Sequence, residues 1–437
     1  MQRWVLLLII GLAVLVNLVN AFGPELGFDA LWYHLTIPKI YQMWGKVDFI
    51  PGGLLYYSAM PRLGEFLYWF GDVPAHLVNW FFGIATAVVI YKISKRYLAS
   101  SYALLATCIF YVTPIIGFMS GSAYVDIIRT FFECLAFYFV ISNQQIKAGV
   151  ALGLAISTKT FAIGSVPILI VVDILLNKKF RNSILIFILS FLVGGGWFLW
   201  SYLKTGYPFY PIGAGILDQT HNLIIRNPLS LISDFWNLWI KPVDVITPVY
   251  LLILPFLTFK KIPKELIIYV LLSYLVWWLT PNTGGGRFIL PYLPAWAVAV
   301  TVIIKNSGQK ILVVAVILIS VLNIGYRVLA QKKLIPYFSG KQNKVAYLCQ
   351  NLDFKTRVYV DCDGWLGQNV SESELLYVTG VHNLYYLNRN FVHETWYRGE
   401  KIDYVLAQGP GIKFPDSGPW LLVHSDQKTD TGIYRRL

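Results

Sequence analysis

The sequence predicts an α-helical, polytopic membrane protein that ends in a small α/β domain. Of its 437 residues, 56% are hydrophobic and only 14% are charged, whereas soluble domains carry about 25% charged residues. The apolar residues gather in segments of up to about 20 residues, the length that crosses a bilayer. After residue 331 the chain turns polar and short strand-like runs replace these segments. We therefore expect a membrane domain over 1–331 and a soluble α/β domain over 332–437.

Eleven apolar segments are expected to form the helices of the membrane domain. The fifth and sixth are too short to span alone without tilt or thinning, and we expect them to form a hairpin. The segments cover 4–21, 74–93, 100–118, 123–141, 147–158, 160–176, 183–203, 245–259, 264–280, 288–304 and 310–328.

The basic residues predict the orientation of these segments. A net charge of +13 raises the question of nucleic acid, but the lysines and arginines lie in short loops between apolar segments. Positive-inside topology explains that placement better, so no nucleic-acid partner is expected. Basic residues follow each even-numbered segment, which places the N-terminus in the cytoplasm and the tail outside. The first segment is read as a retained helix, because no small-residue cleavage site follows it.

Three regions are then expected to lie outside the membrane with substantial length: the first external loop, the loop 204–244 and the tail. In the first external loop, 22–73, the stretch 30–44 has the apolar and aromatic spacing of a helix that lies on the membrane surface. The tail contains two cysteines, Cys349 and Cys362, which are free to pair if the tail is extracytoplasmic, although spacing alone does not show a bridge. Strands are expected over 357–361, 375–378, 404–406, 420–423 and 433–435.

Two carboxylates at outward ends of apolar segments are the candidate catalytic residues. Asp29 follows the first segment, and a carboxylate at that depth is a site hypothesis in a membrane protein. It is suited to accept a proton from a hydroxyl that attacks a substrate, or it caps the following helix. Asp126 opens the fourth segment and has the same alternatives, a cap or a solvated loop acid. His34 lies five residues beyond Asp29 and either lines the same site or sits at the interface.

The candidate substrate-binding residues are mostly cationic. Lys159 separates the two short segments and either holds a phosphate as a point charge or extends to the interface. Arg287 follows Gly284–Gly286 and either grips a phosphate with two hydrogen bonds or is an ordinary arginine at a helix end. Arg62 and Glu65 are further candidates, with a surface ion pair as the alternative.

Several chemistries lack their motifs. No phosphate-binding P-loop, HExxH, paired CxxC or GxSxG sequence occurs, so nucleotide-driven transport and serine hydrolysis are not supported. The six histidines have no close spacing that makes a convincing metal cage. A divalent metal stays open as a cofactor, and no other cofactor is expected.

Taken together, five motifs resemble those of a known group of enzymes. They are FDALWYHL at 28–35, YVD at 124–126, GVALGLAISTK at 149–159, GYPFYP at 206–211 and RFILPYLP at 287–294. Each motif alone is loose, but their order over about 20–300 resembles the GT-C superfamily of polytopic membrane glycosyltransferases. Within it, the layout is similar to the protein O-mannosyltransferase and aminoarabinose transferase branch.

The resemblance implies a GT-C-like fold and an inverting transfer of sugar from a polyprenyl-phosphate carrier at the outer face. The acceptor would be a glycan, a lipid or a protein. Asp29 would be the base, and Lys159 and Arg287 would lie near the lipid phosphate. The mannosyltransferases carry two adjacent acids in the first loop, whereas Ala30 follows Asp29 here, so neither sugar nor acceptor is assigned.

Two other classes of function remain as alternatives. A transporter or flippase of lipid-linked sugars would line its path with such charges, but transporters usually show internal repeats and broken helices near the midplane. Here no repeat is found, and the charged candidates lie at outward boundaries. A structural protein whose tail binds a partner is the third alternative.

Overall fold

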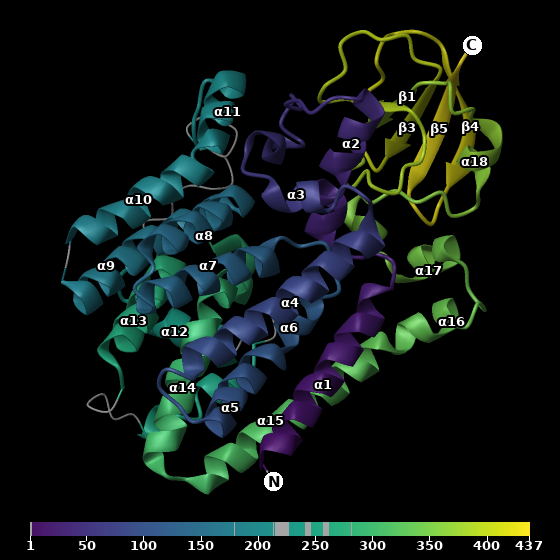
Figure 1. Ribbon diagram of the computed structural model, residues 1–437. Helices are drawn as coiled ribbons and strands as arrows, with labels where there is room; N and C mark the ends of the chain where they lie inside the picture. Colours follow the sequence, from purple (N-terminus) through teal and green to yellow (C-terminus); the bar gives the residue numbers. More distant parts are fainter. Residues whose placement is uncertain are drawn as a thin grey trace. The chain divides into compact units, whose positions relative to one another are not determined.

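The computed structural model (Figure 1) describes residues 2–178, 180–212, 214, 227–240, 246–256, 262–280 and 282–437. The chain divides into two compact units, and each combines segments that are distant in sequence. The first unit comprises Met1–Gly23, Met60–Gly64 and His76–Lys332, and the second comprises Pro24–Ala59, Glu65–Ala75 and Lys333–Leu437. Most of the predicted first external loop therefore belongs to the same compact unit as the tail.

In the described residues of the first unit, the regular secondary structure is helical. Its main elements are α1 (Gln2–Ala21), α4 (Asp72–Ser94), α5 (Ser100–Tyr111), α6 (Pro114–Met119), α7 (Asp126–Ile141), α8 (Gln145–Thr158), η3 (Thr160–Gly164), α9 (Ser165–Asn177), α10 (Phe180–Gly194), α11 (Gly196–Thr205), α12 (Ser230–Ile240), α13 (Lys264–Leu279), η7 (Asn282–Tyr292), α14 (Leu293–Ser307) and α15 (Lys310–Ala330). The first residues of α4 belong to the second unit.

Within the described part of the chain, five helical segments are long and apolar enough to cross a membrane. A sixth is added if α10 and α11 count as one span bent by 45°. The predicted number of eleven is therefore not confirmed. One reason is that proline and glycine interrupt the apolar runs: the segment 100–118 divides at Pro114, and 183–203 bends at Gly195.

One further prediction for the first unit was wrong. In the described part of the segment 245–259 there is no long helix, only the 3₁₀ turns η4 (Pro248–Tyr250) and η5 (Leu254–Phe256). Pro248 and Pro255 lack the N–H that a continuous helix needs. The region expected to form an external loop, 204–244, contains the helix α12.

Close packing of α8 against α10 explains the glycines of the 149–159 motif. A Cβ at Gly149 would lie 2.7 Å from the Cβ of Leu189, and one at Gly153 would lie 2.5 Å from the Cβ of Val193. Small residues four apart are a known means of bringing membrane helices together. This contact fixes α8, and hence the position at which its C-terminal end presents Lys159.

The second unit contains one mixed five-stranded sheet with the order β2-β1-β3-β5-β4. β1 pairs in parallel with β2 and β3, whereas β5 pairs antiparallel with β3 and β4. The strands are β1 (Leu376–Thr379), β2 (Phe391–His393), β3 (Tyr404–Gln408), β4 (Trp420–Asp426) and β5 (Thr431–Arg436). The helical elements are η1 (Ala30–His34), α2 (Thr36–Trp44), η2 (Tyr56–Ala59), α3 (Leu63–Leu67), η8 (Gln331–Leu334), α16 (Ile335–Phe338), α17 (Lys344–Asn351), η9 (Phe354–Thr356) and α18 (Trp365–Asn369). Of these, α3 and η8 each contain residues of both units.

The first-loop helix covers the sheet. Ile37 and Ile40 of α2 are 0% and 1% exposed and belong to the same hydrophobic core as the strand residues Val378 and Leu406. The apolar face that predicted a helix on the membrane surface therefore packs inside the second unit. The strand expected over 357–361 is reduced to a bridge between Val358 and Asn383.

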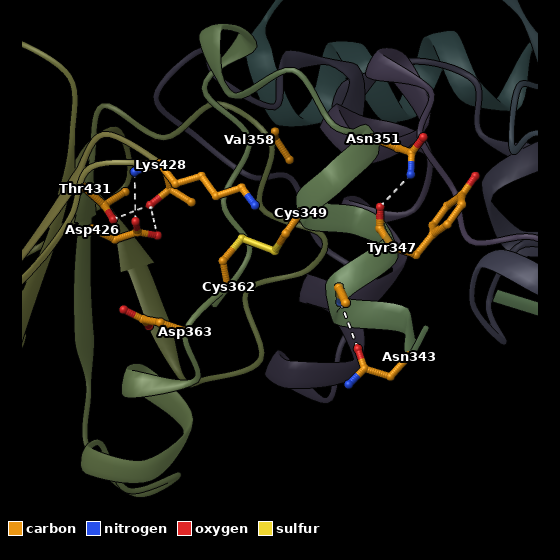
Figure 2. Close-up of a disulfide and its surroundings, with 12 residues drawn as sticks. Asn343, Tyr347, Cys349, Asn351, Val358, Cys362, Asp363, Asp426, Lys428 and Thr431 are labelled. Atoms are coloured by element: carbon orange, nitrogen blue, oxygen red, sulfur yellow. Dashed lines mark hydrogen bonds between the residues drawn. A yellow bond between two sulfur atoms is a disulfide. The ribbon is translucent and has the colours of Figure 1, made fainter. Parts of the chain in front are cut away.

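A disulfide joins two segments of the tail (Figure 2). Cys349 on α17 bonds to Cys362, which precedes α18, with a Cα–Cα distance of 5.9 Å. The loop that it closes is short, which on the chain-entropy account is consistent with a stabilisation of about 3 kcal/mol. The pairing that the sequence left open is thus present.

Candidate functional site

The first unit brings three of the candidate residues together. Lys159 Nζ donates a hydrogen bond of 2.7 Å to Asp126 Oδ1, and Arg287 Nε lies 3.9 Å from Asp126 Oδ2. The carboxylate is nearly inaccessible, with 1% of its side chain exposed, whereas the two cations retain 14% and 15%. An approaching ligand would therefore meet the cations before the carboxylate.

Local backbone structure places each member of this cluster. Asp126 is the first residue of α7, where a negative charge is favourable at the helix N-terminus, but its side chain points to Lys159 instead of capping the helix. The preceding loop is tied to α4 because Asn79 Nδ2 donates to the carbonyl oxygens of Ser122 and Tyr124. Lys159 is extended at the end of α8. The interpretation of Lys159 as a cation that extends to the interface was wrong.

Aromatic rings surround the two cations. The charged groups of Lys159 and Arg287 lie 5.2 and 5.4 Å from the ring centroid of Phe288, and Arg287 also lies 5.1 Å from that of Tyr124. Such contacts stabilise a cation without neutralising it. Arg287 itself belongs to the 3₁₀ segment η7, before α14 begins.

A second buried ion pair lies further along α7 and was missed from the sequence. Arg129 Nε donates to Glu133 Oε1 at 2.5 Å, and Ser165 Oγ also donates to Glu133. Arg129 further bonds the carbonyl of Phe161 and the hydroxyl of Tyr292, each at 3.3 Å. The pair thus ties α7 to the segments that follow Lys159 and Arg287. Two opposite charges four residues apart in an apolar helix were the signal that was overlooked.

In the second unit, Asp29 precedes the π-helical turn η1. Its side chain makes no capping hydrogen bond, so the interpretation as a simple helix cap was wrong, and the Tyr33 hydroxyl donates to Asp29 Oδ2 over 3.4 Å. π-helical turns are rare and occur frequently at functional sites. Asp29 precedes this turn and His34 is its last residue, which was not evident from the sequence.

Aromatic side chains of the second unit gather next to Asp29. The ring of His382 lies 5.2 Å from that of Phe28 and 4.4 Å from that of Trp32. Burial lowers the pKa of His382, which favours the neutral imidazole. Tyr33 stacks on Tyr57 at 3.6 Å. These residues form an apolar wall with polar edges beside the carboxylate.

The remaining candidates have other partners than expected. His34 Nδ1 and Glu65 Oε1 lie 2.7 Å apart in the second unit, and both side chains are buried. Arg62 belongs to the first unit, is 2% exposed, and places its guanidinium 5.4 Å from the rings of both Trp197 and Trp200. Neither Arg62 nor Glu65 is a surface residue, so the surface ion-pair alternative was wrong.

No metal centre is evident in the described ranges. There, no group of three or more His, Cys, Asp or Glu side chains is placed to hold a metal ion.

Part of the chain is similar in sequence to a known protein family. Residues 57–200 match the sequence family described as dolichyl-phosphate-mannose-protein mannosyltransferase. No curated protein matches the chain in sequence.

Solved structures share the fold over almost the whole chain. ArnT from Cupriavidus metallidurans, bound to undecaprenyl phosphate, superposes with a TM-score of 0.62 at 13% identity, over 98% of this chain and 97% of ArnT. The oligosaccharyltransferase of Archaeoglobus fulgidus, in complex with zinc and sulfate, gives a TM-score of 0.51 at 12% identity, over 92% of this chain and 68% of its own. The chain therefore shares the fold of ArnT and of this oligosaccharyltransferase, and the GT-C-like fold that its motifs predicted is confirmed.

Proposed function

We propose that this protein is a membrane glycosyltransferase that transfers a sugar from a polyprenyl-phosphate carrier to an acceptor hydroxyl. The observation that carries the proposal is the cluster of Lys159 and Arg287, two partly exposed cations over the buried Asp126. Lipid-linked phosphate is an anion that such a cluster is suited to bind. The fold is shared with ArnT, whose structure holds undecaprenyl phosphate.

The chemistry follows from these charges. The acceptor oxygen forms a bond to the anomeric carbon as the bond from that carbon to the phosphate oxygen breaks, with inversion. The carrier phosphate leaves with the bonding electrons, and the cations stabilise its growing charge. The acceptor proton passes to a base. Because the donor bond supplies the free energy, no nucleotide site is needed.

Asp29 is the proposed base, and the π-helical turn behind it supports that role. Asp126 was predicted as a second catalytic carboxylate. Its hydrogen bond to Lys159 and its burial favour a different role, in which it fixes the positions of the two cations. His34, Glu65 and Arg62 are proposed to hold the surrounding segments in place.

The proposed location is a cell membrane, crossed several times, with the N-terminus in the cytoplasm and the tail outside. The pattern of basic loops supports this orientation. The Cys349–Cys362 disulfide supports it too, because disulfides persist mainly in oxidising compartments. The proposed membrane domain is 1–331 and the proposed extracytoplasmic domain is 332–437, the latter joined by most of the first loop.

The experiment is sugar transfer by the purified full-length protein from a panel of radiolabelled polyprenyl-phosphate sugars. Wild type is compared with Asp29→Asn, which keeps the shape of the side chain but cannot take up the proton. We expect turnover with at least one donor and a loss of about 10²–10⁴-fold in the variant. Intact folding of the variant is checked by its size-exclusion profile and thermal unfolding.

Two results would contradict the proposal. Equal turnover by wild type and Asp29→Asn would remove Asp29 from the reaction. Movement of the labelled lipid across vesicle membranes without any transfer would favour the flippase alternative.

A further inference from the structure

A second candidate site lies entirely within the second unit. A cleft of about 1110 Å³ opens between α2, the segment 68–71, α17, the segment that leads into α18, and residues 385–389. Its volume is slightly above the usual range for small-molecule sites, about 300–1,000 Å³. The residues proposed to bind the carrier phosphate, Lys159 and Arg287, do not line it, and neither does Asp126.

The cationic side chains that line the cleft are already bound to protein oxygens. Lys39 Nζ donates to the carbonyl oxygens of Tyr385 and Leu387, each at 2.6 Å, and to Asn388 Oδ1 at 3.3 Å. Lys344 pairs with Asp72 at 2.7 Å. The guanidinium of Arg389 donates to four backbone carbonyls, those of Leu366, Gly367, Val370 and Asn388.

The acidic side chains of the lining are committed in the same way. Asp361 accepts hydrogen bonds from the backbone N–H groups of Leu366 and Gly367, at 3.2 and 2.7 Å. Asp363 accepts from the N–H of Trp365 and lies 2.8 Å from His424 Nε2. A charged ligand would have to displace one of these existing partners, which disfavours phosphorylated or acidic ligands.

Aromatic rings and primary amides provide the remaining surface. Phe70 is 82% exposed, and Trp69 beside it is half-buried. Exposed amides come from Gln42, Gln368 and Asn388. Gln42 Nε2 donates to the carbonyl oxygen of Trp69, and Asn388 Oδ1 accepts from Lys39. The flat C–H face of a sugar ring packs on an aromatic ring, and an amide both donates to and accepts from neighbouring hydroxyls.

We propose that this cleft binds a neutral oligosaccharide, which is the acceptor of the transfer reaction or the part of the acceptor next to the modified sugar. The acceptor role rests on the proposed function, whereas the binding of the saccharide does not. A neutral peptide also carries amide groups, but it lacks the flat C–H faces that the rings of Phe70 and Trp69 suit.

The test is direct binding to the full-length protein in lipid nanodiscs, without any donor. The ligands are neutral gluco-, manno- and N-acetylglucosamine oligomers, an acidic galacturonate oligomer, and a neutral serine- and threonine-containing peptide. Saturation-transfer NMR and calorimetry should detect at least one neutral oligosaccharide with a Kd below about 1 mM. The acidic oligomer and the peptide should bind at least tenfold more weakly.

Matched variants locate the binding. Phe70→Ala should raise the Kd for the saccharide by roughly tenfold, within the range for loss of an aromatic contact. Gln368→Ala should raise the Kd by roughly fivefold, the scale of one lost hydrogen bond. Gln427→Ala removes an exposed amide of the same unit that does not line the cleft and should leave the Kd unchanged.

Stronger binding of the peptide or the acidic oligomer, equal affinities in all variants, or no saccharide binding would each overturn the proposal. Failure of the proposed function gives a different result: the saccharide binds and Phe70→Ala weakens it, but no donor yields transfer. The two proposals therefore fail separately.

Discussion

In the first unit two cations share one buried carboxylate, whereas in the second unit each charged side chain that lines the cleft has its own partner. Lys159 and Arg287 both face Asp126 and keep part of their surface exposed. Lys39 and Arg389, in contrast, are held by backbone carbonyl oxygens. The first arrangement suits an incoming anion and the second suits a neutral ligand, although both regions contain lysine, arginine and aspartate. What a charged side chain can bind thus depends more on the partners it already has than on which residue it is.

The largest effect is expected from the buried Arg129–Glu133 pair, which lies on α7 one to two turns beyond Asp126. Glu133→Gln would leave the guanidinium uncompensated, and breaking such a pair typically costs about 3–5 kcal/mol of stability. The double variant Arg129→Met/Glu133→Met should regain most of it, because a well-packed apolar pair avoids the buried charge. Denaturant titration of the purified protein measures both.

The same double variant tests whether the Arg129–Glu133 pair also positions the cations or only stabilises the fold. Because Arg129 anchors Phe161 and Tyr292, we expect the double variant to fold but to show a raised KM for the donor. A stable double variant with an unchanged KM would show that the pair does not position the cations.

The disulfide is expected to have the next largest effect, and it acts on the second unit. Cys349→Ser/Cys362→Ser should lower the stability of that unit by about 3 kcal/mol. Unfolding followed by limited proteolysis of the tail measures the change. A reducing agent should destabilise wild type to the same extent and leave the double variant unaffected. A wild type that is indifferent to reduction would show that the bond does not form in the isolated protein.

Removing single cations tests the comparison itself. Lys159→Met and Arg287→Met should each lower kcat/KM for the lipid-linked donor by about 10²-fold, the scale of one lost charge-stabilising donor. The kcat/KM of Arg287→Lys should lie between those of wild type and Arg287→Met, since lysine keeps the charge but lacks the planar guanidinium. Lys147→Met, at the opposite end of α8, is the control and should have no effect.

The cleft provides the opposite case. Lys344 is paired with Asp72, so Lys344→Met should change the affinity for a neutral oligosaccharide by less than about twofold. A loss as large as that of Phe70→Ala would mean that the cleft uses its charges, and the contrast between the two units would fail.

Local patterns predicted those parts of the fold that depend on local sequence. The helices α1 and α15 follow from uninterrupted apolar runs, and the strands β1, β3, β4 and β5 from short β-branched and aromatic runs. β2 was missed because three residues leave too little pattern. The union of α2 with the sheet was missed because it joins residues more than 300 positions apart, which no local period reports.

The candidate site was predicted in part for the same reason. Boundary charges such as Asp126, Lys159 and Arg287 stand out because apolar residues surround them, and the structure brings these three together. The roles of their packing supports were not predicted. Gly153, Phe288 and Tyr292 belong to motifs that carried the resemblance, but only their spatial contacts show what each one holds in place.

Among the changes in stability, the smallest is expected from Lys39, and it depends on pH. Burial lowers the pKa of Lys39 to about 7 in the folded unit, whereas an unfolded lysine has a pKa of about 10.4. Between these values the unfolded chain binds the extra proton, so the stability of the unit should rise with pH. After allowance for the partly exposed amine, we expect a rise of about 1–2 kcal/mol between pH 7 and pH 10. Unfolding titrations at these two pH values, with wild type beside Lys39→Met, measure it. The variant should lack this part of the rise, and an equal slope in both proteins would assign the pH dependence to other groups.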